Sequence, residues 1–349
     1  MKGSAVTCTT FGVDIGKSLF HVCGCDDSGK PVLRKKLNRK TVIEFFVNAP
    51  EAVVGMEACP GSQWLARKLI AQGHDARIMA AQFVKPYLKN QKNDANDAEA
   101  IAEAVQRPTM RFVGVKHLDQ VDTQALHRVR DRLVRQQTQI ISQTRALCLE
   151  YGITIPTGVP AFWRDMPRIL EDADNDLTPR MRRLVATLWD DVQHVQKRLK
   201  VMSDEIKSIA AHDETARRLM SIPGIGALSA TAIVSAVSNP ADFKRGRDLA
   251  AWIGLVPRQH STGGQPKLLG ISKRGNPYLR KLLIHGARAV KLHLNREKDR
   301  LGPWLNNAEQ RMHPNKVTVA LANKIARVAW VILTTPGATY DKGAINSIA

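Results

Sequence analysis

Four acidic residues stand where carboxylates could bind metal ions. Asp14 and Glu57 each end an apolar run with the composition of a buried strand, and Asp94 and Asp97 open a run of good helix formers. Because Asp94 and Asp97 are three residues apart, they share one face of that helix. Carboxylates at the ends of neighbouring strands and on a following helix can converge at one sheet edge. We therefore expect the four side chains to form one cluster.

Such a cluster favours metal-dependent phosphodiester chemistry. Four close acids repel one another and stay ionised only with divalent cations between them. Mg²⁺ prefers hard oxygen ligands, and two such ions can activate the attacking oxygen and stabilise the leaving one. Asp94 and Asp97 alone could be capping acids that compensate the helix dipole. The two strand acids, Asp14 and Glu57, make the metal site the better interpretation.

Ser261 is the second candidate for chemistry. It begins a glycine-rich loop, Ser261-Thr262-Gly263-Gly264, and four cations lie near it in the sequence: Arg258, Lys267, Lys273 and Arg274. Most serines in such loops only form turns. A serine surrounded by phosphate-binding cations can instead attack phosphorus, provided that another group removes its proton. We rank the adjacent His260 only weakly as that base, because in an extended loop it would point elsewhere.

The charge of the chain indicates a polyanionic partner. The sequence has 52 Lys and Arg residues against 32 Asp and Glu residues, a formal charge of +20 and a pI of about 10.0. Nucleic acid is favoured over an anionic membrane surface, because the cations are spread over many segments. A group of arginines on one helix is usually a solvated face. Because few acidic residues lie nearby, nucleic-acid contact is favoured here for Arg128, Arg130, Arg132 and Arg135.

The cysteines and the hydropathy favour a cytoplasmic protein that acts at the nucleoid. The cysteines are odd in number and lack metal-ligand spacing, which is typical of reduced thiols: Cys8, Cys23, Cys25, Cys59 and Cys148. The N-terminus leads directly into a predicted strand, and no apolar run approaches the ~18 residues of a membrane span. We therefore expect neither export nor membrane insertion.

The N-terminal third has the pattern of a ribonuclease-H-like sheet. Strands are expected at 6–14, 19–23, 31–37, 52–57 and 76–79, and helices at 41–47, at 63–71 and from Asp94 onward. Three strands before the first helix, followed by alternation, differ from a doubly wound nucleotide fold. The expected fold class is α/β in this part and mainly α in the remainder.

Long helices follow residue 116. Apolar residues recur at sevens in the first helix, at Leu126, Leu133, Ile140 and Leu147. The second, capped at Thr178-Pro179, has a coiled-coil seam of Met181, Val185, Leu188, Val192, Val195, Leu199, Met202, Ile206 and Ile209. The seam could close an antiparallel hairpin within one chain or form a dimer interface, and the prolines between the helices, Pro156, Pro160 and Pro167, allow either. A homo-oligomer is expected.

The stretch Leu219–Ile233 resembles a helix-hairpin-helix. Gly224 and Gly226 let the backbone turn tightly, so that N–H groups at the next helix start could hold a phosphate. A purely structural turn is the alternative. The Ser261 loop comes next, and helices are expected from there to Leu333.

Taken together, these motifs resemble the DEDD insertion-sequence transposases, the insertion-sequence 110/1111 family. The matching segments are Gly12–Lys17, Met56–Ala58, Asn93–Ala98, Ile222–Gly226, Gly254–Arg258, Ser261–Gly264 and Ile271–Asn276. The resemblance covers nearly the whole chain. It implies a RuvC-like catalytic domain at 1–116, a coiled-coil link at 117–212 and a transposase domain at 213–349. Many relatives carry two serines where this chain has Ser261-Thr262, so Ser261 inherits the role of nucleophile.

The resemblance also implies a mechanism. Members of the family form a covalent serine–DNA intermediate, and the RuvC-like acids with Mg²⁺ complete a composite site between protomers. They use a structured bridge RNA that pairs with both target and donor DNA. A chain of charge +20 without an obvious base-reading helix is compatible with handing recognition to a guide.

Three other functions compete with this one. Gly12–Lys17 also resembles the first phosphate loop of actin-like kinases and ATPases. These enzymes need a second phosphate loop at the end of a later strand, and the candidates here, Asp27-Ser28-Gly29 and Asp341-Lys342-Gly343, are poorly placed for it. A protein that only binds nucleic acid would not need four acids at strand and helix ends. A RuvC-like nuclease of the Holliday-junction-resolvase type is the closest rival, and it leaves Ser261 unexplained.

Overall fold

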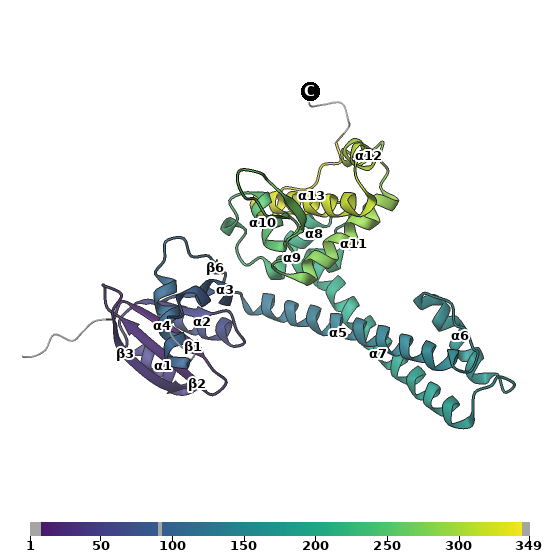
Figure 1. Cartoon of the computed structure of the whole chain (residues 1–349), viewed down its shortest axis with the longest axis horizontal. Helices are drawn as coiled ribbons and strands as arrows, with labels where there is room; N and C mark the ends of the chain where they lie inside the picture. Colours follow the sequence, from purple (N-terminus) through teal and green to yellow (C-terminus); the bar gives the residue numbers. More distant parts are fainter. Residues whose placement is uncertain (1–7, 90–92, 344–349) are drawn as a thin grey trace, which may run out of the picture. The chain divides into compact units, whose positions relative to one another are not determined.

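The computed structural model describes residues 8–89 and 93–343 (Figure 1). The chain forms two compact units, Met1–His117 and Leu118–Ala349. Parts of three expectations lie outside the described residues: Val6 and Thr7 of the first strand, 90–92 of the first domain, and 344–349 of the last domain.

A six-stranded sheet forms the first unit, in the order β3-β2-β1-β4-β5-β6. The first three strands are an antiparallel meander of β1 (Thr10–Ile15), β2 (Leu19–Cys25) and β3 (Pro31–Asn38). The next two, β4 (Val53–Glu57) and β5 (Asp75–Met79), run parallel to β1, and β6 (Phe112–Val113) closes the edge. This order agrees with the ribonuclease-H-like prediction. The short elements β6, α3 (Ala81–Val84) and η1 (Lys85–Tyr87) were not predicted.

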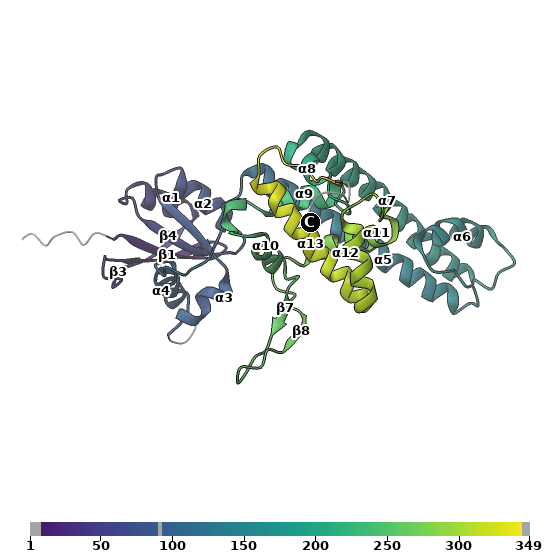
Figure 2. The same cartoon turned by 90° about the horizontal axis from the view of Figure 1, so that it is seen from above.

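Helices cover both faces of this sheet, as Figure 2 shows. Two helices, α1 (Arg39–Val47) and α2 (Ser62–Ile70), lie on one face over a core that includes Phe11, Phe46 and Leu65. The other face carries α4 (Asp94–Val105), which buries Ala98 and Ala102 against Cys23 and Cys25. Because side chains alternate along each strand, residues 12, 14 and 21 belong to the α4 face.

The second unit begins with an antiparallel helical hairpin. Its long helices are α5 (Leu118–Leu149) and α7 (Pro179–His212), with α6 (Val159–Glu171) between them in the chain. Arg130 of α5 donates to Ser203 of α7, and Gln137, seven residues later, donates to Gln196, seven residues earlier. These two bonds fix opposite helix directions.

The hairpin buries the predicted seam inside the chain. Val185, Val192, Val195, Leu199 and Ile206 of α7 are all buried, and the first four belong to one core with Leu133 and Ile140 of α5 and Phe162 and Met166 of α6. Of the two alternatives, the intrachain hairpin is therefore the one present. Because α5 and α6 cover the seam, no second copy is needed to bury it.

The remainder of this unit is helical. Its helices are α8 (Glu214–Leu219), α9 (Ala227–Ala236), α10 (Gly246–Ile253), α11 (Pro277–His293), α12 (Leu301–Arg311) and α13 (Pro314–Thr334), with the 3-10 turn η2 at Pro240–Asp242. A hairpin of β7 (Pro257–Gln259) and β8 (Leu268–Ile271) leaves this helical body between α10 and α11 (Figure 2).

Contrary to the prediction from hydropathy, one described helix, α13, is long and apolar enough to cross a membrane. Its residues Val317, Leu321 and Ile325 are buried in the core of the second unit, which also includes residues of α9, α10 and α11. Those contacts are those of a core helix.

Candidate active site

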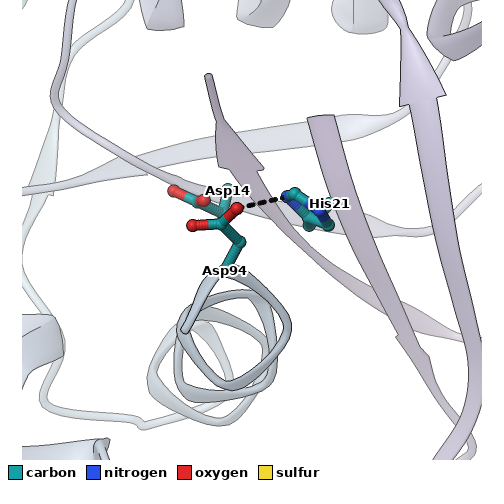
Figure 3. Close-up of side chains that lie close together, drawn as sticks. All are labelled: Asp14, His21 and Asp94. Carbon is teal, nitrogen blue, oxygen red and sulfur yellow. Dashed lines mark ion pairs between the residues drawn. The ribbon is translucent and has the colours of Figure 1, made fainter. Parts of the chain in front are cut away.

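Three side chains from three elements meet at one edge of the sheet. Figure 3 shows Asp94, at the start of α4, beside Asp14 of β1 and His21 of β2. One ligand atom from each residue lies within 4.8 Å of the other two. His21 Nδ1 and Asp94 Oδ2 are 3.6 Å apart, which makes them an ion pair when the imidazole is protonated. The structure thus brings Asp14 and Asp94 together, as predicted.

Two glycines set this approach of α4 to the sheet. Gly12 of β1 and Gly55 of β4 are register partners. A Cβ on Gly12 would lie 2.1 Å from the Ala98 carbonyl oxygen, and one on Gly55 would lie 2.7 Å from Val105 Cβ. The helix therefore rests directly on the strand backbones. Asp14 and Glu57 follow these glycines by two residues on the same face, toward the helix start.

Glu57 and Asp97 lie next to this group without joining the three-residue set. Burial raises the pKa of the Cys59 thiol, and the charges of Asp14 and Glu57 raise it further, so both carboxylates lie near that sulfur. Asp97 is one turn beyond Asp94, and its Oδ1 is buried without a hydrogen-bond partner in the described part of the chain. An orphaned carboxylate oxygen is costly. Carboxylate oxygens, one of which lacks a partner among the described residues, suit a divalent cation.

His21 was not predicted from the sequence as a site residue. It is the register partner of Asp14 across the β1–β2 hairpin, whose turn is closed by the bond from the Gly16 N–H to the Leu19 carbonyl, so that register is the signal that would identify it. Lys17 and Lys36 were not predicted either. Lys17 and Lys36 line a cavity of about 250 Å³ at this site. The three ligand candidates, Asp14, His21 and Asp94, line the same cavity. Lysines beside metal ligands suit a phosphate-bearing substrate.

Ser261 lies near the tip of the β7–β8 hairpin and is exposed. Thr262 and Gln265 form a bridge around Gly263 and Gly264, whose φ angles of 57° and 76° are left-handed. This is the geometry of a two-residue type I′ turn, which requires positive φ at both positions. The Ser261 hydroxyl accepts a 2.9 Å hydrogen bond from the Gln259 amide. That bond orients Oγ and leaves its proton available to donate.

The structure does not bring all the predicted cations to Ser261. Ser272 donates to the Val256 carbonyl, which places Lys273 and Arg274 at the base of the hairpin. Ser261 lies five residues beyond Val256, roughly 16 Å along an extended strand. His260 donates its N–H to the Lys267 carbonyl, so these two residues face each other. Alternation then puts both on the face opposite to Ser261, in line with the low rank given to His260.

The other predicted nucleic-acid residues fall into two groups. Arg128 and Arg132 are exposed on α5, and neither has an ion-pair partner among residues 8–89 and 93–343; Arg135 is paired with Asp131 at 2.9 Å. In the turn between α8 and α9, Gly224 has a φ of 85° and contacts Gly286 of α11, so its role includes packing. Gly226 caps α9 with open space around it.

The sequence also resembles those of known proteins. Residues 11–153 match the model of a transposase of the DEDD IS110 type, and residues 216–301 match the model described as "Transposase IS116/IS110/IS902 family". The chain is similar to the transposase for insertion sequence element IS1111A of Coxiella burnetii, with 42% identity over 95% of this chain and 91% of the relative.

It is also similar to the transposase for insertion sequence element IS1328 of Yersinia enterocolitica, with 40% identity over 96% of this chain and 99% of the relative. Both matches span nearly the full length of each protein, and the two family models together include the acid cluster and the Ser261 hairpin. The chain belongs to the IS110 family of insertion-sequence transposases.

Proposed function

We propose that this transposase cuts and rejoins DNA through a covalent bond between Ser261 and DNA, and that a Mg²⁺-binding acid set serves the reaction. The observation that carries the metal part is the meeting of Asp14 and Asp94 beside the orphaned oxygen of Asp97. The exposed hydroxyl of Ser261 at a hairpin tip supports the covalent part. We assign cleavage chemistry to residues 1–116, the helical link to 117–212 and the nucleophile to 213–349.

The metal ligands in this proposal are Asp14, Glu57, Asp94 and Asp97. Mg²⁺ bound there supplies positive charge that stabilises phosphate oxygens at the transition state. Lys17 and Lys36 line the same cavity and hold the DNA phosphate beside the acids. The Gly12–Gly55 contact keeps α4 close enough for Asp94 to take part.

Ser261 carries out a balanced exchange of phosphodiester bonds. Its Oγ forms a bond to phosphorus while the bond from phosphorus to one deoxyribose oxygen breaks, and that oxygen receives the serine proton. Rejoining reverses the step with a different DNA hydroxyl, so no energy source is consumed. Gln259 orients Oγ, and Arg258 of β7 lies three residues before Ser261 in the same arm of the hairpin. Lys267, Lys273 and Arg274 bind flanking phosphates in this scheme.

Guidance and assembly complete the proposal. A bridge RNA selects the target and donor DNA, which is supported by the charge of +20 and by the lack of an obvious base-reading helix in the sequence. Arg128, Arg132, Arg135, Gly224 and Gly226 contact nucleic acid. The protein works as a homo-oligomer in the cytoplasm, at the nucleoid. Its subunits contact one another through surfaces other than the buried α7 seam. Sequencing RNA that co-purifies with the protein tests the guidance directly.

The covalent step is tested by trapping the adduct. Wild-type protein, its co-purified RNA, DNA containing the ends of the element and Mg²⁺ are mixed under single-turnover conditions and resolved in denaturing gels. We expect a protein–DNA adduct that Ser261→Ala abolishes and the neighbouring control Thr262→Ala retains, with DNA and RNA binding intact in both.

Two results would contradict the serine mechanism. An adduct that persists in Ser261→Ala makes another residue the nucleophile, with Thr262 and Ser272 next in line. DNA cleavage by wild type with no adduct at any time favours the simple RuvC-like nuclease instead.

A further inference from the structure

His21 is held at the acid cluster by the sheet itself. It lies in the middle strand of the β3-β2-β1 meander, paired in register with Asp14 on one side and Lys36 on the other. Its side chain is 18% exposed, against 68% for Asp94. The imidazole is therefore fixed in position, whereas the Asp94 carboxylate on the first turn of α4 has room to adjust.

The geometry does not fit a simple structural ion pair. The separation of 3.6 Å between His21 Nδ1 and Asp94 Oδ2 is longer than the ~2.9 Å of a closed hydrogen bond. An ion pair with so exposed a carboxylate contributes little to stability. If Asp94 needed only a positive charge nearby, Lys17 or Lys36, which line the same cavity, could supply it. The pair therefore gives no reason for an imidazole at this point.

The three donor atoms do fit around one ion. Donors on a common ion lie at most about 4.4 Å apart, twice a metal–ligand distance of about 2.2 Å. Here they lie within 4.8 Å of one another, with His21 Nδ1 and Asp94 Oδ2 at 3.6 Å, so a shift of a few tenths of an ångström brings the set to the spacing that one ion requires. Figure 3 shows that the His21 ring and the two carboxylates converge from β2, β1 and α4.

We propose that His21 is a nitrogen ligand of a divalent ion that Asp14 and Asp94 also bind. This inference rests on the metal site of the proposed function and adds a ligand to it. Imidazole favours transition metals, whereas Mg²⁺ prefers oxygen ligands alone. The site therefore binds Mn²⁺ in preference to Mg²⁺, and Glu57 and Asp97 remain as oxygen ligands beside it.

Electron spin-echo spectroscopy of bound Mn²⁺ tests this directly, because a coordinated imidazole nitrogen modulates the echo. The full-length protein is loaded with Mn²⁺ alone, and Mg²⁺ is then added in competition. We expect nitrogen modulation in wild type and a binding constant for Mn²⁺ at least about tenfold tighter than for Mg²⁺.

Two variants isolate His21. His21→Asp replaces the nitrogen by an oxygen donor, so it should bind Mn²⁺ without nitrogen modulation and lose most of the preference over Mg²⁺. The matched control is His285→Asp, at an exposed histidine of α11, which should behave as wild type. Circular dichroism shows whether each variant keeps its fold, and His21→Asn serves if His21→Asp does not.

The outcomes separate this inference from the proposed function. Mn²⁺ bound to wild type without nitrogen modulation overturns the role of His21 and leaves the acid site standing. Modulation that survives in His21→Asp also overturns it, because another histidine is then the ligand. Absence of any bound Mn²⁺, together with DNA cleavage that proceeds in EDTA, overturns both the ligand and the metal-dependent function.

Discussion

At the scale of single residues, Asp97 stands out because one of its carboxylate oxygens has no partner among the described residues. Its Oδ1 is buried without a hydrogen-bond partner within the described chain, and Asp94 lies one turn away on the same face. A buried carboxylate oxygen without a hydrogen-bond partner is costly, and the like charge of Asp94 adds repulsion. A cation between the two carboxylates removes both costs at once.

Asp97→Asn should therefore abolish the stabilisation that Mg²⁺ gives the wild-type protein. A ligand at 100 times its dissociation constant stabilises the native state by about 2.7 kcal/mol. We expect melting curves with Mg²⁺ and with EDTA to differ for wild type and to coincide for Asp97→Asn. Asp27→Asn, at an exposed turn, is the matched control and should keep the wild-type difference. A full Mg²⁺ effect in Asp97→Asn would remove Asp97 from the ligand set.

At the scale of elements, the position of α4 depends on the absence of a side chain at Gly12. Its backbone lies so close to the sheet that a single methyl group on Gly12 would overlap the Ala98 carbonyl. Interiors this tightly packed respond to one carbon atom. The contact between Gly12 and Ala98, one helical turn after Asp94, thus sets the distance between Asp14 and Asp94.

Gly12→Ala should push α4 off the sheet. Overpacking of this kind costs about 1–3 kcal/mol, which urea denaturation of the full chain measures. We also expect weaker metal binding, because Asp94 moves away from Asp14. Gly270→Ala, where a Cβ meets no atom within 4 Å, is the control and should not lose stability. Equal stabilities for the two variants would contradict the close contact.

A second element-scale device is the buried network that joins α5 to α9 and α11. His127 bonds to Thr231 Oγ1 and Tyr278 Oη, each at 3.0 Å. Thr231 donates its hydroxyl proton to the Ala227 carbonyl, so Thr231 accepts from His127 Nε2 and Tyr278 donates to Nδ1. The network requires a neutral imidazole. Burial, with a smaller contribution from Arg130, lowers the pKa of His127 to about 4.

This network should weaken in acid. The unfolded chain binds a proton at His127 below pH ~6.5, whereas the native protein does not until about pH 4. The free energy of unfolding therefore decreases as the pH is lowered through that window. The loss amounts to at most about 3 kcal/mol. Urea denaturation of wild type and His127→Leu between pH 7 and pH 4.5 measures it as the difference between the two slopes. Parallel slopes would show that His127 is protonated in the native state.

The strands and helices follow from local patterns, and that is why they could be predicted. The apolar composition of the first strand, the helix formers that follow Asp94 and the seam of α7 each act within one element. His21 could not be found in that way, because its meaning depends on the residue opposite it across a hairpin. The partner of the α7 seam was equally hidden, since an apolar stripe does not identify what covers it.

At the scale of the whole molecule, the excess of positive charge governs binding to nucleic acid. Neutralised phosphates release counterions, so affinity falls with salt in proportion to the contacts made. Arg128 and Arg132 are exposed and have no ion-pair partner within the described chain, whereas Lys200 of α7 is paired with Asp204. These cations should therefore differ in their effect on salt dependence.

Arg128→Ala and Arg132→Ala should each reduce the salt slope of DNA or RNA binding by about 0.9. Titrations at several salt concentrations by fluorescence anisotropy give that slope. Lys200→Ala is the control on the same helical hairpin and should change the slope little, because its charge is already balanced by Asp204. An unchanged slope in both arginine variants would place the nucleic acid on another surface.

The last prediction separates the fold of the helical hairpin from assembly of the protein. Val195 and Leu199 are buried between α7 and its neighbours, whereas Leu184 and Val201 of the same helix are 50% and 60% exposed. Val195→Glu with Leu199→Glu puts two charges in an apolar core, which should unfold the hairpin and lower both helicity and melting temperature.

The matched pair, Leu184→Glu with Val201→Glu, should keep the fold, so light scattering of that variant reports on association alone. A smaller mass than wild type would assign the oligomer contact to the exposed side of α7, and an unchanged mass would assign it elsewhere. A Val195→Glu and Leu199→Glu protein with full helicity but reduced mass would reverse the conclusion, because the seam would then join two chains instead of two helices of one.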